Sequence, residues 1–256
     1  MDVVLAFDIG SSSTRCTAFE AATLKLVHSI QRKYKLKEVE EDAEVIYNLC
    51  EQLMDEMCCY LCSIPAKVSA IGICSFAMNL VGVDDENNVC TPILHYRRQV
   101  SEDTLEKVKK LFGEELSKEQ VRCGVNVLHE SYALGQLIEF GDNVRVTGWT
   151  TIASYILSKW IDDASFNKIS LGEAAWTGML DRTTLDWSTK SLETLQTLLF
   201  NTTDVSLYQI LPRPTDPRCW RSELGVKYKL SVKPHTQQVL EEAQIMLGVP
   251  DAVAAT

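Results

Sequence analysis

Between Asp8 and Arg15 the chain carries a carboxylate, a glycine (Gly10), four hydroxyl side chains and a guanidinium, the hydroxyls being those of Ser11, Ser12, Ser13 and Thr14. A carboxylate at the end of a strand can hold a hydrated Mg²⁺ ion. Backbone N–H groups and hydroxyls in a tight turn can surround phosphate oxygens, and an arginine can pair with those oxygens bidentately. These residue types predict a site for the phosphates of a nucleotide, with Asp8 at the metal.

Two extended segments must hold this turn in place. Residues 3–7 form a short apolar run with β-branched side chains, which predicts a buried central strand because the run is too short for a helix. Gly10, which can adopt a positive φ, and three serines interrupt the run, and residues 16–19 resume an extended pattern. The alternative, which these residues leave open, is a hairpin whose hydroxyls only satisfy the geometry of the turn.

The following segments predict an open mixed sheet. Residues 24–34 alternate as a third strand, apolar residues between 45 and 61 recur at helical spacing up to Pro65, and residues 68–75 and 80–83 read as strands. The order β-β-β-α-β predicts three antiparallel strands followed by a crossover helix and a parallel fourth strand. Helices are expected further on, at residues 102–112, 132–140, 150–161 and 192–200.

The order Asp-x-Gly-Ser-x-Ser-x-Arg after an apolar first strand resembles the first phosphate-binding hairpin of the FGGY carbohydrate kinases, relatives of actin and the heat-shock chaperones. This resemblance implies an α/β ribonuclease H-like domain that uses ATP and Mg²⁺. Asp8 would be the carboxylate at Mg²⁺. The ATP phosphates would be bound by the turn residues Gly10, Ser11, Ser12, Ser13, Thr14 and Arg15.

A second segment, residues 169–187, carries small residues leading to Gly178, then Met-Leu-Asp181, a short turn and Trp187. It resembles an FGGY kinase segment in residue types and spacing, and the segment around His129 and Tyr132 is similar to another. Together these segments resemble the amino-terminal half of a gluconokinase or xylulokinase. The alternative is a generic loop between helices, anchored by its tryptophans.

The resemblance implies a general base near residue 250. The FGGY kinases place the carboxylate that takes the proton of the sugar hydroxyl in a Gly-x-x-Asp-x-x-Ala-Ala context, which is similar to residues 248–255 here. Asp251 is therefore the candidate catalytic base, because a positioned carboxylate assists deprotonation of a hydroxyl during phosphoryl transfer. The alternative is that Asp251 only caps a helix, since Asp before Ala-Val-Ala-Ala is a favourable N-cap.

The substrate-binding segments depart from the family pattern. Met78 stands where an imidazole often occurs, next to Asn79, and Arg97 and Arg98 occupy a segment in which the family has Asp and Arg. We expect these four residues to line the substrate. Replacing a carboxylate with an arginine inverts the local charge, which favours an acidic substrate such as a sugar acid or a non-catalytic role.

The composition is that of an ordinary globular chain. Of the 256 residues, 46% are apolar and 23% are charged, and the formal net charge is −10. This charge argues against nucleic acid as the main partner, because such binding depends on Lys and Arg neutralising phosphates. No apolar run can span a bilayer and no cationic leader precedes the first strand, so we expect a cytoplasmic protein without membrane contact. The oligomeric state, a homo-oligomer included, stays open.

The cysteines predict buried thiols. Their number, nine, is odd, and the chain is too large to need disulfide cross-links. Cys50, Cys58 and Cys62 recur at helical spacing without a second Cys or His pair nearby, so we expect them to pack in the core.

We therefore expect residues 1–250 to form a sugar-binding domain and residues 251–256 to begin a second, nucleotide-covering domain that is absent. The expected partners are a nucleotide and a sugar or sugar acid. Since phosphoryl transfer needs closure around both substrates, a truncated chain of this kind would bind nucleotide weakly and turn over slowly or not at all. The alternative function is a catalytically inactive, kinase-like interaction module.

Overall fold

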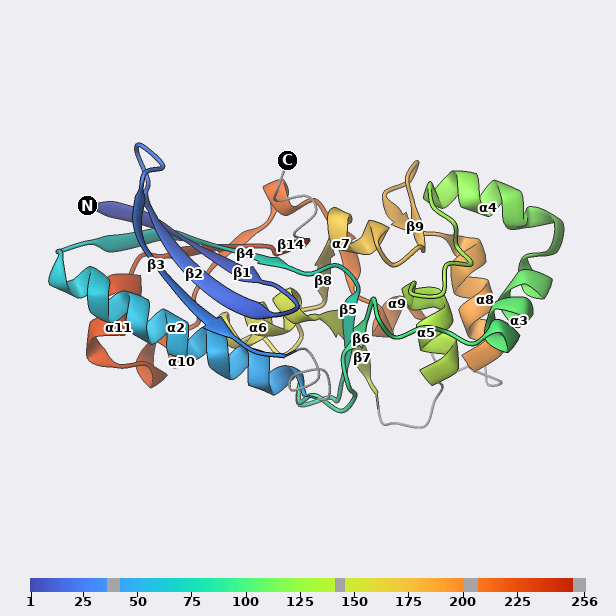
Figure 1. Ribbon diagram of the computed structural model, residues 1–256, viewed down its shortest axis with the longest axis horizontal. Helices are drawn as coiled ribbons and strands as arrows, with labels where there is room; N and C mark the ends of the chain where they lie inside the picture. Colours follow the sequence, from blue (N-terminus) through green and yellow to red (C-terminus); the bar gives the residue numbers. More distant parts are fainter. Residues whose placement is uncertain (36–41, 141–145, 200–206, 251–256) are drawn as a thin grey trace. The chain divides into compact units, whose positions relative to one another are not determined.

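The computed structural model describes residues 1–35, 42–140, 146–199 and 207–250 (Figure 1). Within the span that the sequence predicts as one domain, the contacts form two compact units. Unit 1 comprises the described parts of Met1–Phe76, Ile152–Phe166 and Asp216–Thr256, and unit 2 comprises those of Ala77–Thr151 and Asn167–Thr215. The expected domain boundary at residue 251 lies outside the described residues.

Unit 1 is built on a seven-stranded sheet in the order β12-β13-β4-β1-β2-β3, with β14 also paired to β4. Its elements are β1 (Asp2–Ile9), β2 (Ser13–Glu20), β3 (Leu26–Lys33), α2 (Ala43–Ser63), β4 (Lys67–Ser75), α6 (Ile152–Trp160), a 3₁₀ turn (Pro217–Cys219), β12 (Arg221–Glu223), α10 (Val226–Ser231), α11 (Pro234–Leu240), β13 (Gln244–Met246) and β14 (Val249–Pro250).

The strand pairing in unit 1 confirms the predicted order. β1 is antiparallel to β2, β2 is antiparallel to β3, and β4 lies parallel to β1 on its other side. This register places Asp8 of β1 between Arg15 of β2 and Cys74 of β4. The residue types needed for a phosphate site therefore meet at one end of three adjacent strands.

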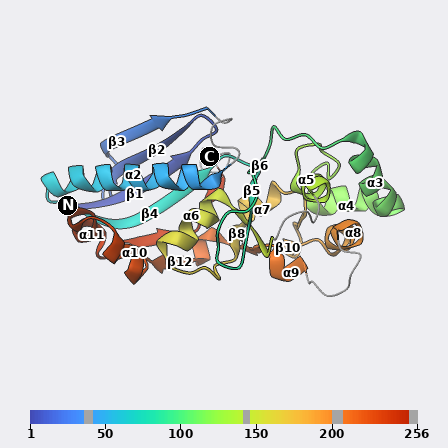
Figure 2. The same ribbon diagram turned by 90° about the horizontal axis from the view of Figure 1, so that it is seen from below.

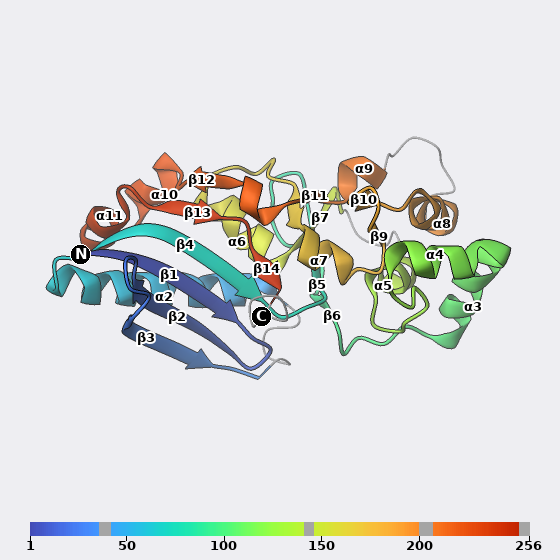
Figure 3. The same ribbon diagram turned by 90° about the horizontal axis from the view of Figure 1, so that it is seen from above.

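One face of the unit 1 sheet carries the core. Alternate residues of β1 are buried on this face, where Phe7 packs edge-on against Trp160 of α6, with 5.2 Å between the ring centroids. Figure 2 shows α2 and α6 lying across this side of the strands. The opposite face, turned toward the viewer in Figure 3, carries the half-buried residues Val4, Ala6 and Gly72.

Local signals fix the ends of the helices. Asp42 caps α2 by accepting a hydrogen bond of 2.8 Å from the N–H of Glu44, and the helix ends before Pro65. Ser101 caps α3 in the same way, accepting from the N–H of Thr104 at 3.4 Å. Asp42 and Glu44 thus place negative charge at the positive end of α2.

Unit 2 contains the three-stranded sheet β6-β5-β7, two strand pairs and several helices. Its elements are β5 (Asn79–Val83), β6 (Leu94–His95), α3 (Glu102–Phe112), a 3₁₀ turn (Gly113–Glu115), α4 (Leu116–Cys123), α5 (Ala133–Phe140), β7 (Gly148–Thr151), β8 (Lys168–Ser170), α7 (Leu171–Ala175), β9 (Leu180–Asp181), β10 (Asp186–Trp187), α8 (Thr189–Leu199), α9 (Leu207–Ile210) and β11 (Arg213–Thr215). A core around Phe112, Leu134 and Leu195 joins these elements.

Two features of the middle segment differ from the sequence prediction. The predicted helix at residues 150–161 begins at Ile152, because Gly148–Thr151 pairs with β5 as an antiparallel strand rich in β-branched and aromatic residues. α4 was not predicted from the sequence. Its buried face holds only Glu119 and Cys123, so it lacks an apolar repeat.

The thiols of α2 differ in burial. Cys50 and Cys58 are fully buried, as expected, whereas Cys62 is only half-buried. Burial raises the pKa of both core thiols, which keeps them protonated. Among the described residues, no helix is long and apolar enough to cross a membrane.

A carboxylate of α2 is also partly removed from solvent. Glu51 accepts hydrogen bonds from Trp160 Nε1 at 2.5 Å and from the Tyr228 hydroxyl at 3.0 Å. Burial raises the pKa of Glu51, while these two hydrogen bonds act in the opposite direction. Ionisation of Glu51 therefore weakens the folded state.

We expect Glu51→Gln to raise the melting temperature of the protein by about 2–4 °C at pH 8. Glutamine keeps an acceptor for Trp160 and Tyr228 but carries no charge. Because the folded-state pKa of Glu51 is raised, its stabilising contribution is present below the ordinary pKa and is lost as the pH rises through the raised value. The difference between variant and wild type should therefore shrink as the pH falls toward 4.

Thermal unfolding followed by circular dichroism at several pH values measures this effect. Glu56→Gln is the matched control, because Glu56 lies on the same helix with 49% of its side chain exposed, paired with Arg32. If the difference in melting temperature between Glu51→Gln and wild type does not change with pH, the pKa of Glu51 is not raised in the folded state.

Candidate functional site

The turn between β1 and β2 is held together by Tyr34. The N–H of Gly10 donates to the carbonyl of Ser13 at 2.9 Å, which closes the turn. The hydroxyl of Tyr34 donates to the Gly10 carbonyl, and the N–H of Tyr34 donates to the Ser12 carbonyl at 3.0 Å. Two carbonyl oxygens of this turn, those of Gly10 and Ser12, are therefore bound by a single residue.

The N–H groups at the tip of the turn, unlike its carbonyls at Gly10 and Ser12, have no hydrogen-bond partner within the described residues. Among the described residues, the N–H groups of Ser11 and Ser12 donate to no other group. Ser12 is exposed and Ser11 is half-buried, while the Ser13 hydroxyl accepts a hydrogen bond of 2.8 Å from Gln31 Nε2. Adjacent N–H groups without an internal acceptor form the kind of concavity that binds phosphate oxygens.

Asp8 and Arg15 lie opposite each other beside this turn. Asp8 is half-buried and accepts a hydrogen bond of 3.7 Å from the Cys74 thiol, whereas Arg15 is exposed. Within the described part of the chain, neither residue forms an ion pair. A carboxylate and a guanidinium in this arrangement can contact a hydrated cation and a phosphate, respectively.

Two residues of the turn differ from the sequence prediction. Thr14 is fully buried and its hydroxyl donates to Tyr34 at 3.4 Å, because strand alternation points it toward the core face. Its side chain thus supports the turn. Gly10 does not adopt a positive φ, and a Cβ atom built there would lie 3.3 Å from the Ser13 carbonyl. The glycine therefore serves close approach of the backbone.

The predicted substrate residues lie in unit 2. Asn79 is buried at the start of β5 and stands opposite His95, the last residue of β6. Met78, just before it, adopts a positive φ of 56°. A left-handed conformation is costly for a side chain such as methionine and marks a locally strained backbone.

Met78 and Asn79 line a small cavity within unit 2. The other polar or aromatic walls are Gln136 of α5, Thr151 at the end of β7, and Glu173, Trp176 and Thr177 of the α7 segment. The cavity volume is about 10 Å³, which is room for one water molecule. A sugar therefore does not fit inside this cavity, and these side chains could contact a sugar only from outside it.

The two predicted arginines follow β6. Arg97 is exposed, with its guanidinium carbon 5.5 Å from the centre of the Tyr96 ring, and Arg98 lies 6.0 Å from the centre of the Phe140 ring. Both contacts are cation–π interactions. The two arginines thus contact different aromatic rings. Arg97 is the nearer of the two in sequence to His95, which pairs with Asn79.

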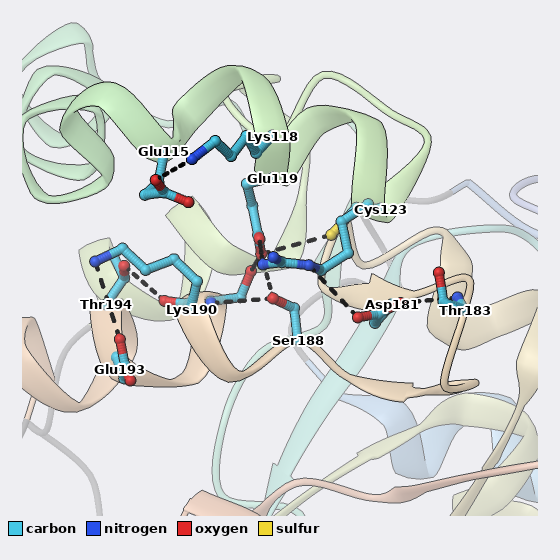
Figure 4. A network of polar contacts seen from close by, with 12 residues as sticks. Glu115, Lys118, Glu119, Cys123, Asp181, Thr183, Ser188, Lys190, Glu193 and Thr194 are labelled. Carbon is cyan, nitrogen blue, oxygen red and sulfur yellow. Dashed lines mark hydrogen bonds and ion pairs between the residues drawn. The ribbon is translucent and has the colours of Figure 1, made fainter.

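The second sequence signature is fixed by a buried carboxylate (Figure 4). Glu119 of α4 is fully buried and pairs with Arg122 at 2.6 Å, while Arg122 also reaches Asp181 of β9 at 3.5 Å. The hydroxyls of Ser188 and Ser191 donate to Glu119, the latter at 2.7 Å. Because a buried charge needs several such partners, this network ties α4, the β9–β10 turn and α8 together.

The comparison with protein families matches residues 3–199 to a model described as the amino-terminal domain of the FGGY family of carbohydrate kinases. The chain belongs to this family. A comparison with curated proteins finds no match.

Solved structures show the fold of this FGGY chain. The ligand-bound xylulose kinase from Lactobacillus acidophilus has a TM-score of 0.80 at 18% identity, and the gluconate kinase from the same organism has 0.77 at 17%. The glycerol kinase from Plasmodium falciparum with ADP has 0.74 at 17%. Each alignment covers 100% of this chain and 49% of the other, so the chain spans about half the length of these structures. The likeness confirms the ribonuclease H-like α/β fold.

The candidate base Asp251 lies outside the described residues. The motif's glycine, Gly248, is described, and a Cβ atom built there would lie 2.5 Å from the Ala153 Cβ of α6. Glycine at this position therefore lets the chain following β13 pass close to α6, and the same residue carries the resemblance to the FGGY motif.

Sequence reasoning missed three residues that organise these sites. They are Tyr34, which holds the turn, Gln136, which lines the cavity, and Glu119, which anchors the second signature. The spacing of Glu119 and Arg122 could have indicated an ion pair on one helix face. The partners of the other two lie far away in the sequence, so no local pattern reveals them.

We expect Tyr34→Phe to lower the free energy of unfolding by about 1 kcal/mol, because it removes the donor to Gly10 and the acceptor for Thr14. Burial raises the pKa of Tyr34 to about 12, so the hydroxyl is protonated and can donate at neutral pH. Urea unfolding at pH 7 measures the loss.

Tyr60→Phe is the control for this change. Its ring stacks on His28 with 3.9 Å between centroids, and its hydroxyl has no partner among the described residues. An equal loss of stability in both variants would show that the Tyr34 hydroxyl does not hold the turn.

Proposed function

We propose that this protein is a carbohydrate kinase that transfers the γ-phosphoryl group of MgATP to a hydroxyl of a sugar or sugar acid. The observation that carries the proposal is the β1–β2 turn, where the N–H groups of Ser11 and Ser12 lack an acceptor among the described residues and Arg15 follows on β2, opposite Asp8. Family membership supports the same reaction class.

The phosphates of ATP would bind at this turn. The N–H groups of Ser11 and Ser12 and the hydroxyls of the serines would donate to phosphate oxygens, and Arg15 would add a charge-assisted pair. Asp8, half-buried and without an ion pair in the described part of the chain, suits a hydrated Mg²⁺ that neutralises phosphate charge. Tyr34 would keep the turn carbonyls directed away from the anion.

The acceptor would lie against the wall formed by Met78 and Asn79. Arg97, exposed on the turn that follows β6, would pair with an anionic group, which favours a sugar acid over a neutral sugar. A gluconate kinase and a xylulose kinase both share the fold, so both ligand types deserve a test.

Asp251 would act as the general base. As the bond between the γ-phosphorus and the bridging oxygen of ADP breaks and the bond to the sugar oxygen forms, the hydroxyl proton would pass to the Asp251 carboxylate. Positioning and exclusion of water account for most of the rate in such reactions. Since this chain spans about half the length of the kinases that it matches, we expect slow turnover from it alone.

A non-catalytic interaction module is the second candidate function. It is favoured by the sheet face of unit 1 opposite α2 and α6, which Figure 3 shows turned toward the viewer. The paired residues Val4 and Ala70, and Ala6 and Gly72, on the adjacent strands β1 and β4 are apolar and half-buried. Sheets with parallel strands usually have both faces covered. On this alternative, the face would pack against a partner and nucleotide binding would be absent.

Nucleotide binding separates the two functions. We expect calorimetric titration of ADP into the protein to give heat that depends on Mg²⁺, and we expect Arg15→Ala to weaken binding about 10-fold by removing a charge-assisted contact. Arg221→Ala is the control, because Arg221 is also exposed, on strand β12 of the same sheet. Absence of Mg²⁺-dependent heat in the wild type would favour the interaction module.

Phosphoryl transfer tests the base. We expect Asp251→Asn to lower the rate of transfer from MgATP at least about 100-fold, with a small change in KM, because only proton removal is affected. The assay uses high protein concentration, a panel of xylulose, gluconate and glycerol, and Asp85→Asn, an exposed loop aspartate, as control. An unchanged rate would reject Asp251 as the base.

A further inference from the structure

The carboxamide of Gln136 bonds to the turn that carries Arg97. Gln136 is 3% exposed and lies on α5, where it also lines the cavity beside Asn79. Its Nε2 atom donates to the carbonyl of His95 at 2.9 Å and to the carbonyl of Arg98 at 2.7 Å. One side chain therefore holds both ends of a four-residue turn.

The same turn is closed by its own backbone. The N–H of Arg98 donates to the His95 carbonyl at 2.9 Å, and the N–H of Arg97 donates to His95 Nδ1 at 3.1 Å. His95 stands opposite Asn79 in the β5–β6 pair. The turn thus begins beside Asn79, which we propose to line the acceptor site. Tyr96 and Arg97 lie between the two carbonyls that Gln136 binds, and the guanidinium of Arg97 lies over the Tyr96 ring.

The chemistry of these contacts requires two N–H groups. A carboxamide nitrogen supplies both, whereas a carboxylate of the same shape would turn an oxygen toward two carbonyl oxygens, and a thioether would leave both carbonyls without this donor. Without Gln136 the His95 carbonyl would keep the N–H of Arg98, but the part-buried carbonyl of Arg98 would lose this donor. Losing a hydrogen bond at a part-buried carbonyl is costly, so the contact fixes the backbone of the turn more firmly than packing alone would.

We propose that Gln136 is a positioning residue that orients Arg97 toward the acceptor substrate by fixing the His95–Arg98 turn. This inference rests on the proposed function, in which Arg97 contacts an anionic acceptor. Binding a ligand at an arginine costs entropy of both its backbone and its side chain, and a backbone that is fixed in advance removes the first of these costs. The cation–π contact with Tyr96 selects a direction for the guanidinium only while the turn keeps its shape.

Hydrogen exchange tests the fixing of the turn without any ligand. In Gln136→Met, which preserves length but has no donor, we expect the amides of Arg97 and Arg98 to exchange about 10-fold faster. Amides in the middle of α3, to which Gln136 makes no hydrogen bond among the described residues, should stay within about 2-fold of wild type. Gln136→Glu keeps the shape of the side chain and should resemble Gln136→Met.

Two results of this experiment would overturn the proposal. Slow exchange at Arg97 and Arg98 in both variants would show that the turn does not depend on Gln136. Wild-type behaviour of Gln136→Glu alone would show that shape, and not the N–H groups, is what the turn requires.

A double-mutant cycle with sodium gluconate as the probe tests the link to Arg97. We expect Gln136→Met and Arg97→Ala each to raise the Kd for gluconate about 10-fold, and the double variant to bind no more weakly than Arg97→Ala alone. Gln120→Met is the control, since Gln120 of α4 bonds to Asn126 at 2.9 Å, away from this turn. Additive losses in the double variant would show that Gln136 does not act through Arg97.

The two experiments separate this inference from the proposed function. If the wild-type protein binds neither gluconate nor xylulose, the proposed acceptor is wrong, and the exchange result alone then decides whether Gln136 fixes the turn. If gluconate binds and the cycle is non-additive, both the acceptor class and the positioning role are supported.

Discussion

The candidate site depends on how the backbone hydrogen bonds of the β1–β2 turn are satisfied. Tyr34 binds the carbonyls of Gly10 and Ser12 from one side, while the N–H groups of Ser11 and Ser12 have no acceptor among the described residues. A turn whose carbonyls pointed outward would repel an anion, whatever hydroxyls it carried. The register of β1 with its neighbours then places Asp8 and Arg15 beside these donors.

Local sequence patterns predicted the amino-terminal part of unit 1, but not its carboxy-terminal elements β12, α10, α11, β13 and β14. The first three strands, α2 and β4 lie where alternation, helical spacing and Pro65 place them, because each pattern reports directly on which residues face the core. The motifs were also informative: the hairpin and the Trp187 segment, which resemble FGGY kinase segments, lie in the span that the family model matches. The exact start of a helix is set by its capping residue, as Asp42 sets the start of α2.

What the sequence could not reveal depends on tertiary contacts. The burial of Thr14 follows from strand alternation, but its support of the turn requires Tyr34, which comes from another strand end. The β7 strand forms because β5 lies beside it, which overrides the helical pattern read from residue 150 onward. Glu119 is buried by contacts with Ser188 and Ser191, which lie about 70 residues away in the sequence. Gln136 likewise gains its partners only when α5 packs against the turn that follows β6.

The order of strands in unit 1 has a consequence for synthesis of the chain. β4 pairs with β1 early in the sequence, but its other neighbours, β13 and β14, come after the whole of unit 2. A nascent chain emerging from the ribosome can therefore assemble β1 to β4 while one edge of β4 stays open. Unpaired edges of this kind invite association with other chains, so chaperone dependence should be greatest during translation of residues 77–243.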